Sequence, residues 1–248
     1  KEIANLTLNG KDLSKIDPAN SPFWTNNKVE KYNPKKEKYL KTKLFPKKGT
    51  EFYLKRIGTG FIKFKSYWIN KKGKKKDITL RVGKEVHAGN LAGHIMRSVG
   101  YNAIPMAYRS EAKLFLGDYT YEEFVSHWSQ SHKIRIHNVM NFVKAYNPAE
   151  NSVILKTVSL EAYPDDKKYR KGGPFRTGRN GFDNRREYRT LLLMSALISH
   201  NDTADRQIRA DLYRPSKDEA WRPHFLLSDL GFSMGSYLIW DNMGAVND

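Results

Sequence analysis

Residues 199–207 read SHNDTADRQ, and residues 224–231 read HFLLSDLG. The first stretch follows an apolar segment with helical spacing, and the second contains an apolar strand, His224 to Leu227, followed by Ser228-Asp229-Leu230-Gly231. A carboxylate at a strand end, such as Asp229, can hold Mg²⁺, while Asp202 in a loop after a helix can face a nucleophile. Gln207 lies five residues after Asp202 and can give the metal an amide oxygen. The two stretches together predict a metal-dependent phosphate site.

The arrangement resembles the catalytic loop and Asp-x-Gly motif of protein-kinase-like folds, above all the atypical bacterial branch with HipA-type and CotH-type kinases. It is more closely similar to a family of uncharacterised bacterial proteins, in which Trp-Asp-x-Lys-Asp-x-Asn precedes Ser-Asp-Leu-Gly. Further matches lie at 80–87, at Gly100-Tyr101 and at 158–161, so the resemblance covers about residues 61 to 236. It implies an α+β, protein-kinase-like, two-lobe domain with a β-rich first lobe and a helix-rich second lobe.

The resemblance also implies ATP and Mg²⁺ as ligands and gives roles to single residues. Arg81 would contact the nucleotide phosphates, and Asp202 would orient or deprotonate an acceptor hydroxyl. Gln207 and Asp229 would hold Mg²⁺. The acceptor would be an unknown protein or small molecule.

Four positions depart from the family pattern. Arg81 replaces a lysine, and its planar guanidinium is larger and points differently. Gly89 replaces the glutamate that pairs with that lysine, although Glu85, one turn earlier, could substitute for it. Ala204 replaces a loop lysine, and Gln207 replaces an asparagine. Because phosphoryl transfer depends on positioning and electrostatics, these losses indicate a weak phosphotransferase or a pseudokinase.

The charge distribution supports a second class of function. The chain has a net charge of +18, and residues 1–76 hold 21 Lys and Arg against 6 Asp and Glu, so most of the excess lies in the first third. Lysine-rich residues 28–76 could attract nucleic acid or another anionic surface, or form a solvated face. The Arg-rich segment 170–189 could likewise contact phosphate or an acidic partner, or be a solvated loop. The alternative function is therefore a basic polyanion- or partner-binding protein without catalysis.

Three regions are expected along the chain: an extended arm over 1–50, a β-rich lobe with one helix over 51–118, and a helix-rich lobe over 119–248. Alternating side chains predict a hairpin with strands near 61–67 and 78–82 around a lysine-rich turn. Helical spacing predicts a helix over 86–99, and a capping box at Thr120–Glu123 predicts another that runs through Trp128. Further expected elements are strands over 101–108, 112–116 and 153–160, a helix from 183 or 184 to 198, and a strand pair near Phe225.

Composition excludes several classes of site. There is no cysteine, so disulfides and thiolate metal sites are impossible. The longest apolar run, Leu191–Ile198, is far shorter than a membrane span, and we expect a soluble protein. A start at Lys1 is typical of a trimmed chain or of the mature form of an exported bacterial protein. The compartment itself stays open.

Overall fold

The computed structural model describes residues 24, 28–36, 44–58, 63–83, 85–132, 139–163, 169–174, 186–200, 208–214 and 216–234. The chain divides into two compact units. The first, here called the barrel unit, comprises Asn33–Gly93, Ile104–Asp165 and Leu230–Asp248. The second, the sheet unit, comprises Lys1–Tyr32, His94–Ala103 and Asp166–Asp229. Both units combine segments that lie far apart in the sequence.

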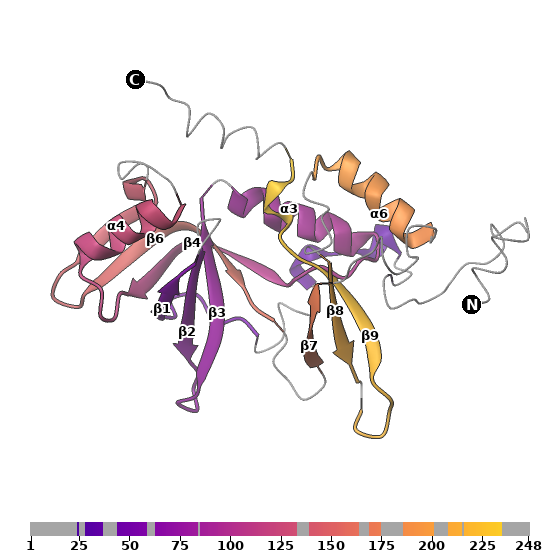
Figure 1. Ribbon diagram of the computed structural model, residues 1–248, viewed down its shortest axis with the longest axis horizontal. Coiled ribbons are helices and arrows are strands. Elements are labelled where there is room, and N and C mark those ends of the chain that lie inside the picture. Colours follow the sequence, from indigo (N-terminus) through magenta and orange to yellow (C-terminus); the bar gives the residue numbers. More distant parts are fainter. Residues whose placement is uncertain are drawn as a thin grey trace, which may run out of the picture. The chain divides into compact units, whose positions relative to one another are not determined.

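Five strands close into a barrel in the order β3-β2-β1-β4-β6, with β6 pairing back onto β3 (Figure 1). A ring of five strands cannot alternate direction all the way round, so one neighbouring pair must be parallel. That pair is β1 and β4, and the other four pairings are antiparallel. The barrel strands are β1 (Phe52–Ile57), β2 (Lys63–Ile69), β3 (Lys75–Val82), β4 (Met106–Phe115) and β6 (Ser152–Glu161). A further strand, β5 (Val143–Asn147), pairs with β6 outside the ring.

The barrel core consists of inward-facing aliphatic side chains closed by aromatic residues of helix α4 (Tyr121–His132). Phe64 of β2 meets Trp128 of α4 edge-on, with ring centroids 4.8 Å apart, and also contacts Phe124. All three side chains are fully buried. Edge-to-face aromatic packing adds to the large apolar area that each ring removes from water. The helix is therefore fixed to the barrel by its apolar stripe.

The sheet unit holds the antiparallel strands β7 (Tyr169–Pro174), β8 (Ile208–Tyr213) and β9 (Arg222–Leu227), in that order. It also holds α6 (Arg186–Leu197) and the end of α3 (Glu85–Ser98). Tyr101, which follows α3, is linked to α6, because its hydroxyl donates to the carbonyl of Glu187 over 2.7 Å. Short 3-10 turns occur at Val29–Lys31, Pro34–Lys36 and Leu230–Phe232.

The expectation of a kinase-like second lobe rich in helices is wrong. The described part of the chain has three α-helices, and only α4 and α6 lie after residue 118. Strands β5 to β9 occupy much of the same region. The decisive element is β6, whose apolar side chains point into the barrel and whose two edges pair with β3 and β4. A strand from the expected second lobe therefore completes the barrel, and the fold is α+β with a closed five-stranded mixed barrel and a small three-stranded sheet.

Several local expectations are confirmed. The lysine-rich hairpin forms between β2 and β3, and α3 begins and ends within one residue of its predicted limits. The capping box forms as predicted: the Thr120 hydroxyl accepts from the Glu123 amide over 3.2 Å, and the Glu123 carboxylate accepts from the Thr120 amide over 2.8 Å. One strand, β4, replaces the two strands expected between 101 and 116.

Candidate functional site

Of the residues predicted to hold metal and phosphate, Asp202 and Gln207 lie outside the described residues. Asp229 lies two residues after the end of β9 and has a φ of 60°. The left-handed region costs a residue other than glycine about 1–2 kcal/mol, and aspartate tolerates it better than most. Asn151, Thr157, Ser199 and Met234 also have positive φ values, so the strain alone does not select Asp229. Strained residues are concentrated at functional sites, and Asp229 is the member of this group with a predicted metal-binding role.

The other predicted site residues, Arg81 and Glu85, belong to a buried ion network in the barrel unit. Arg81 Nε donates to Glu161 Oε2 over 2.7 Å, and Arg81 Nη1 lies 4.0 Å from Glu85 Oε2. All three side chains are at most 10% exposed. The predicted pairing of Arg81 with Glu85 is thus present, but the tight contact is with Glu161, a carboxylate at the end of an apolar strand to which sequence reasoning gave no role.

Lys65 adds a fourth charge to this network. Its Nζ donates to Thr79 Oγ1 over 2.9 Å, and burial lowers the pKa of the Lys65 ammonium, although the nearby Glu161 acts in the opposite direction. Two cations and two carboxylates therefore balance one another inside the barrel unit. Buried charges are tolerated when they are paired in this way. Pairing within the barrel unit therefore accounts for these four charged residues without a bound nucleotide.

Gly89 of α3 lies close to the backbone of Gly231 in the barrel unit. A Cβ added at Gly89 would lie 3.4 Å from the Cα of Gly231, and one added at Gly231 would lie 2.4 Å from Glu85 Oε2. The backbone around Gly231 therefore packs directly against α3. A glutamate at position 89, as in the family that the sequence resembles, would need space that this contact occupies.

An aromatic ladder crosses three strands on the outside of the barrel. The register pairs Tyr53 of β1 with Tyr67 of β2 and with Phe115 of β4. The Tyr53 ring is stacked on both neighbours, with centroid separations of 5.1 Å to Tyr67 and 5.0 Å to Phe115 and interplanar angles of 17° and 11°. All three side chains are half-buried. The Tyr67–Tyr53–Phe115 ladder is thus a row of stacked, nearly parallel rings on an accessible sheet face.

Lysines surround the ladder, but their charges are compensated to different degrees. Lys113 Nζ lies 4.8 Å from the Phe115 ring centroid and forms ion pairs with Glu51 and Glu150. Lys75 Nζ lies 4.7 Å from the Tyr67 ring centroid and makes no ion pair with any described residue. The positive field is therefore stronger at the Tyr67 end of the ladder.

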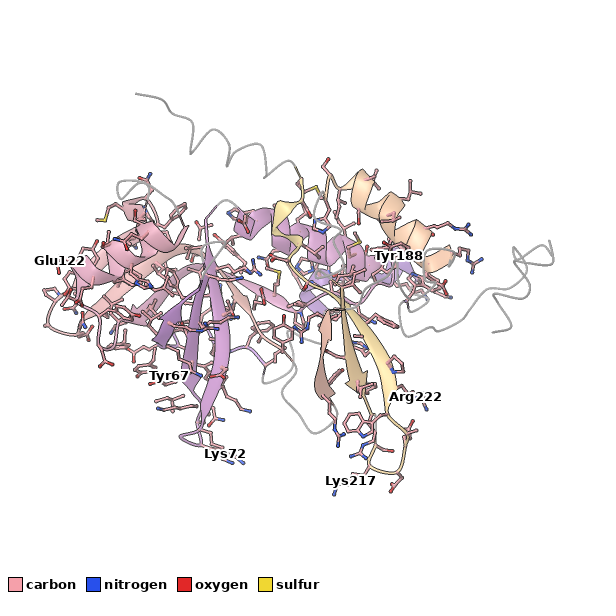
Figure 2. The ribbon with its side chains drawn as sticks, in the orientation of Figure 1. Tyr67, Lys72, Glu122, Tyr188, Lys217 and Arg222 are labelled. Carbon is pink, nitrogen blue, oxygen red and sulfur yellow. The ribbon has the colours of Figure 1, made fainter. Side chains whose placement is uncertain are left out.

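The turn between β2 and β3 adds charge at this same end. The Asn70 side-chain oxygen accepts from the amides of Lys72 and Lys74 over 2.9 and 3.1 Å, and Gly73 supplies a φ of 70°. This tight turn leaves Lys71, Lys72 and Lys74 exposed, and they too form no ion pair with any residue that the structure describes. Figure 2 shows Lys72 at the tip of the hairpin and Tyr67 on β2. The sequence predicted the lysine run but missed the ladder, since its rings meet only through strand pairing.

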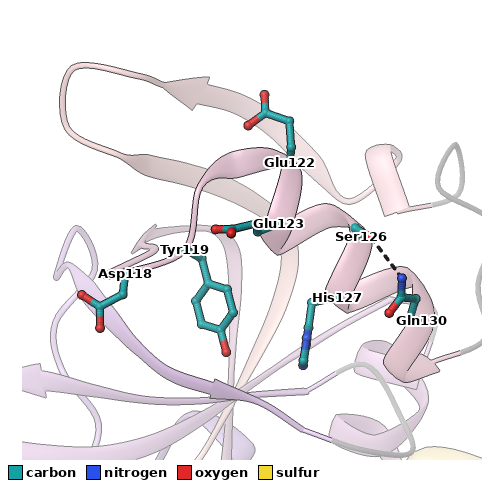
Figure 3. A pocket seen from close by; sticks show the side chains of 7 residues that line it. All are labelled: Asp118, Tyr119, Glu122, Glu123, Ser126, His127 and Gln130. Atoms are coloured by element: carbon teal, nitrogen blue, oxygen red, sulfur yellow. Dashed lines mark hydrogen bonds between the residues drawn. The ribbon is translucent and has the colours of Figure 1, made fainter.

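A different hollow, of about 600 Å³, lies at the start of α4 and is mainly acidic (Figure 3). Glu123 belongs to the capping box described above, and Gln130 Nε2 donates to Ser126 Oγ over 3.2 Å. Its lining residues are Asp118, Tyr119, Glu122, Glu123, Ser126, His127 and Gln130. The helix start explains much of this arrangement, because acidic side chains stabilise the first turn.

Comparisons with protein-family models, with curated proteins and with solved structures find no match. Among the described residues, no group of three or more His, Asp or Glu side chains is placed to hold a metal ion. Nor does any helix in the described ranges have the length and apolar character to cross a membrane. Function must therefore be argued from the aromatic ladder with its lysines, from the hollow at α4 and from Asp229.

Proposed function

We propose that the protein binds single-stranded nucleic acid on the outer face of the barrel. The observation that carries the proposal is the Tyr67–Tyr53–Phe115 ladder beside Lys75, which pairs with no carboxylate among the described residues. Proteins that bind single strands without sequence preference combine a basic track for the phosphates with aromatic rings on which bases stack. Both parts lie on one sheet face here. Tyr53 is stacked between its two neighbours, so a base would take the outer face of Tyr67, over which Lys75 lies. A surface that bound its ligand by charge alone would gain nothing from a row of stacked rings.

The proposal predicts two separable effects, measured by fluorescence anisotropy with a labelled oligothymidylate of about 20 nucleotides. Tyr67→Leu removes a ring but keeps apolar bulk, and affinity should fall by about tenfold or more. Lys75→Gln removes one phosphate contact, so the slope of log K against log salt should decrease by about 1.

Two variants serve as matched controls. Tyr146→Leu breaks another stacked tyrosine pair, with Tyr121, whose ring centroids lie 4.3 Å apart on α4 and β5. Lys156→Gln removes an exposed lysine that lies on β6 four residues from the partner of Phe115. Both should leave binding nearly unchanged. Equal effects of Tyr67→Leu and Tyr146→Leu, or no binding by the folded protein, would reject the ladder as the site.

We propose a second candidate function, Mg²⁺-dependent binding of a nucleotide such as ATP in the sheet unit. The strained backbone of Asp229 favours it, together with the motif spacing of Asp202 and Gln207. In this proposal Asp229 and Gln207 hold Mg²⁺, and Asp202 orients the acceptor. Arg81 is not required, because Glu161 and Glu85 already engage its guanidinium. Mg²⁺ would supply charge neutralisation at the phosphates.

Calorimetric titration of ATP with and without Mg²⁺ tests this candidate. Asp229→Asn is the informative variant, since asparagine tolerates the left-handed backbone and removes only the charge. Micromolar binding that needs Mg²⁺ and is lost in the variant would support the site. Binding that is unchanged in the variant, or absent from the wild-type protein, would reject it.

A further inference from the structure

On one face of the three-stranded sheet, two arginines contact a single tryptophan. Arg170 lies in β7, Arg214 follows β8, and Trp221 precedes β9. The register pairs Arg170 with Leu212 and Leu212 with Pro223, so side chains two residues from these partners share a face with Arg170. The guanidinium carbons lie 4.4 Å (Arg170) and 4.6 Å (Arg214) from the Trp221 ring centroid. The two cations are therefore at most about 9 Å apart.

Neighbouring arginines show that these two are unusual. Arg222 donates to Glu219 over 2.7 Å, and Arg209 lies 3.4 Å from Asp211. By contrast, neither Arg170 nor Arg214 forms a side-chain hydrogen bond or an ion pair within the part of the chain that the structure describes. Among the described residues, the side chain that both guanidiniums contact is Trp221. Within those residues, carboxylates pair with Arg209 and Arg222 but not with Arg170 or Arg214.

Stacking on a ring determines what these guanidiniums can bind. A guanidinium held against a ring by cation–π attraction loses side-chain freedom but keeps its N–H groups, which lie in its own plane. Those groups fit phosphate oxygens in a bidentate manner. Because the side chains are already ordered, less conformational entropy is lost on binding. The arrangement is suited to anions that offer two acceptor oxygens to one guanidinium, as a phosphate group does.

We propose that Arg170 and Arg214, held by Trp221, bind phosphodiester groups of single-stranded nucleic acid. This inference rests on the proposed nucleic-acid function and adds a second contact, in the sheet unit, that depends on phosphate alone. Two cations on one ring, neither of them paired with a carboxylate in the described ranges, suit consecutive phosphates of a strand, whereas a phosphorylated side chain offers only one. Lys217 is exposed on the turn between β8 and β9, between Arg214 and Trp221 in the sequence, and adds a further positive charge there (Figure 2).

The test compares Arg170→Gln and Arg214→Gln with the matched control Arg222→Gln. Each of the first two should lower the salt slope for oligothymidylate by about 1 and weaken binding, because each removes an uncompensated phosphate contact. Arg222→Gln should leave the slope unchanged, since Glu219 already balances its charge. Trp221→Leu keeps both charges but releases them from the ring, so affinity should fall with little change of slope.

An abasic oligonucleotide of equal length separates this inference from the function on which it rests. Without bases, Tyr67→Leu should have no effect, whereas Arg170→Gln and Arg214→Gln should still weaken binding. If both variants behave like Arg222→Gln on both probes, the arginine pair is not a phosphate site, even where the ladder variants do reduce binding. If Tyr67→Leu is silent on oligothymidylate while the arginine variants are not, the ladder fails and the arginine pair stands. If the protein binds neither oligothymidylate nor the abasic strand, both proposals are overturned.

Discussion

The contact between Arg81 and Glu161 shows how strongly a single residue can determine stability in the barrel unit. Both side chains are at most 10% exposed, and they meet at 2.7 Å. Removing one partner of a buried ion pair leaves an uncompensated charge in a medium of low polarity. Glu161→Gln should therefore lower the free energy of unfolding by about 3 kcal/mol, measured by urea denaturation.

The matched control is Glu111→Gln, which breaks the exposed pair of Glu111 with Lys144. Solvent screens that pair, so the expected loss is below about 1 kcal/mol. Similar losses in the two variants would mean that the buried network contributes no more to stability than a surface pair.

His224 gives a pH dependence whose sign follows from its surroundings. Burial lowers the pKa of the His224 imidazole from 6.5, and Asp211 only partly opposes this. The unfolded chain therefore takes up a proton first as the pH falls, so the free energy of unfolding should decrease below pH 6.5 and level off below the folded pKa. His224→Gln should remove this part of the pH dependence. A wild-type profile parallel to that of the variant between about pH 7.5 and 5 would contradict the shift.

At the scale of elements, the irregular pairing of β7 with β8 depends on a glycine. The register shifts between Arg170 and Gly173, and a Cβ at Gly172 would lie 1.6 Å from the carbonyl oxygen of Ala210. That atom belongs to the backbone and cannot rotate away. Gly172→Ala should therefore displace β7 and destabilise the sheet unit by several kcal/mol. It should also weaken nucleic-acid binding, because Arg170 is carried on β7.

Gly73→Ala is a useful comparison for that variant. A Cβ at Gly73 meets no atom within 4 Å, so only its φ of 70° is unfavourable, at about 1–2 kcal/mol. Hydrogen exchange of the β7–β8 amides should rise in Gly172→Ala and stay at the wild-type level in Gly73→Ala. Unchanged protection in Gly172→Ala would show that the strand edge adapts to the methyl group.

Local patterns were sufficient to predict the elements whose contacts lie close in sequence. The β2–β3 hairpin, α3 and the capping box of α4 follow from side-chain alternation, helical spacing and one four-residue motif. The polar run Arg109-Ser110-Glu111 led to two predicted strands where one strand, β4, continues with these residues exposed or half-buried. The pairing of β6 with β3 joins residues about 80 positions apart, which no local pattern specifies, and this is where the predicted two-lobe fold failed.

The same limit applies to the candidate sites. A charge count located the basic hairpin, and a motif located Asp229. The ladder was missed because Tyr53, Tyr67 and Phe115 become neighbours only through strand register. The sequence also could not predict that Arg222 pairs with a carboxylate while Arg170 and Arg214 contact Trp221. That difference depends on which side chains each guanidinium reaches in the folded chain. Composition gives the number of charges, but only tertiary structure shows which ones are balanced.

At the scale of the whole molecule, the net charge of +18 and the two-unit architecture predict how a ligand changes stability. Like charges repel at low salt, so added salt alone should raise the melting temperature. An oligothymidylate at about 100 times its Kd should add about 2.7 kcal/mol to the unit that binds it, at matched ionic strength. Polyglutamate of equal charge density has no bases to stack, and it should stabilise the barrel unit less.

Calorimetry can assign that stabilisation to a unit, because separate units need not unfold in one transition. Tyr67→Leu should remove the part of the shift that comes from base stacking, while Arg214→Gln should reduce the part that persists with an abasic strand. If polyglutamate and oligothymidylate shift the melting temperature equally in every variant, the protein responds to charge alone. The rings of the ladder would then be no more than the packing of a barrel face, and the lysines a solvated surface around it.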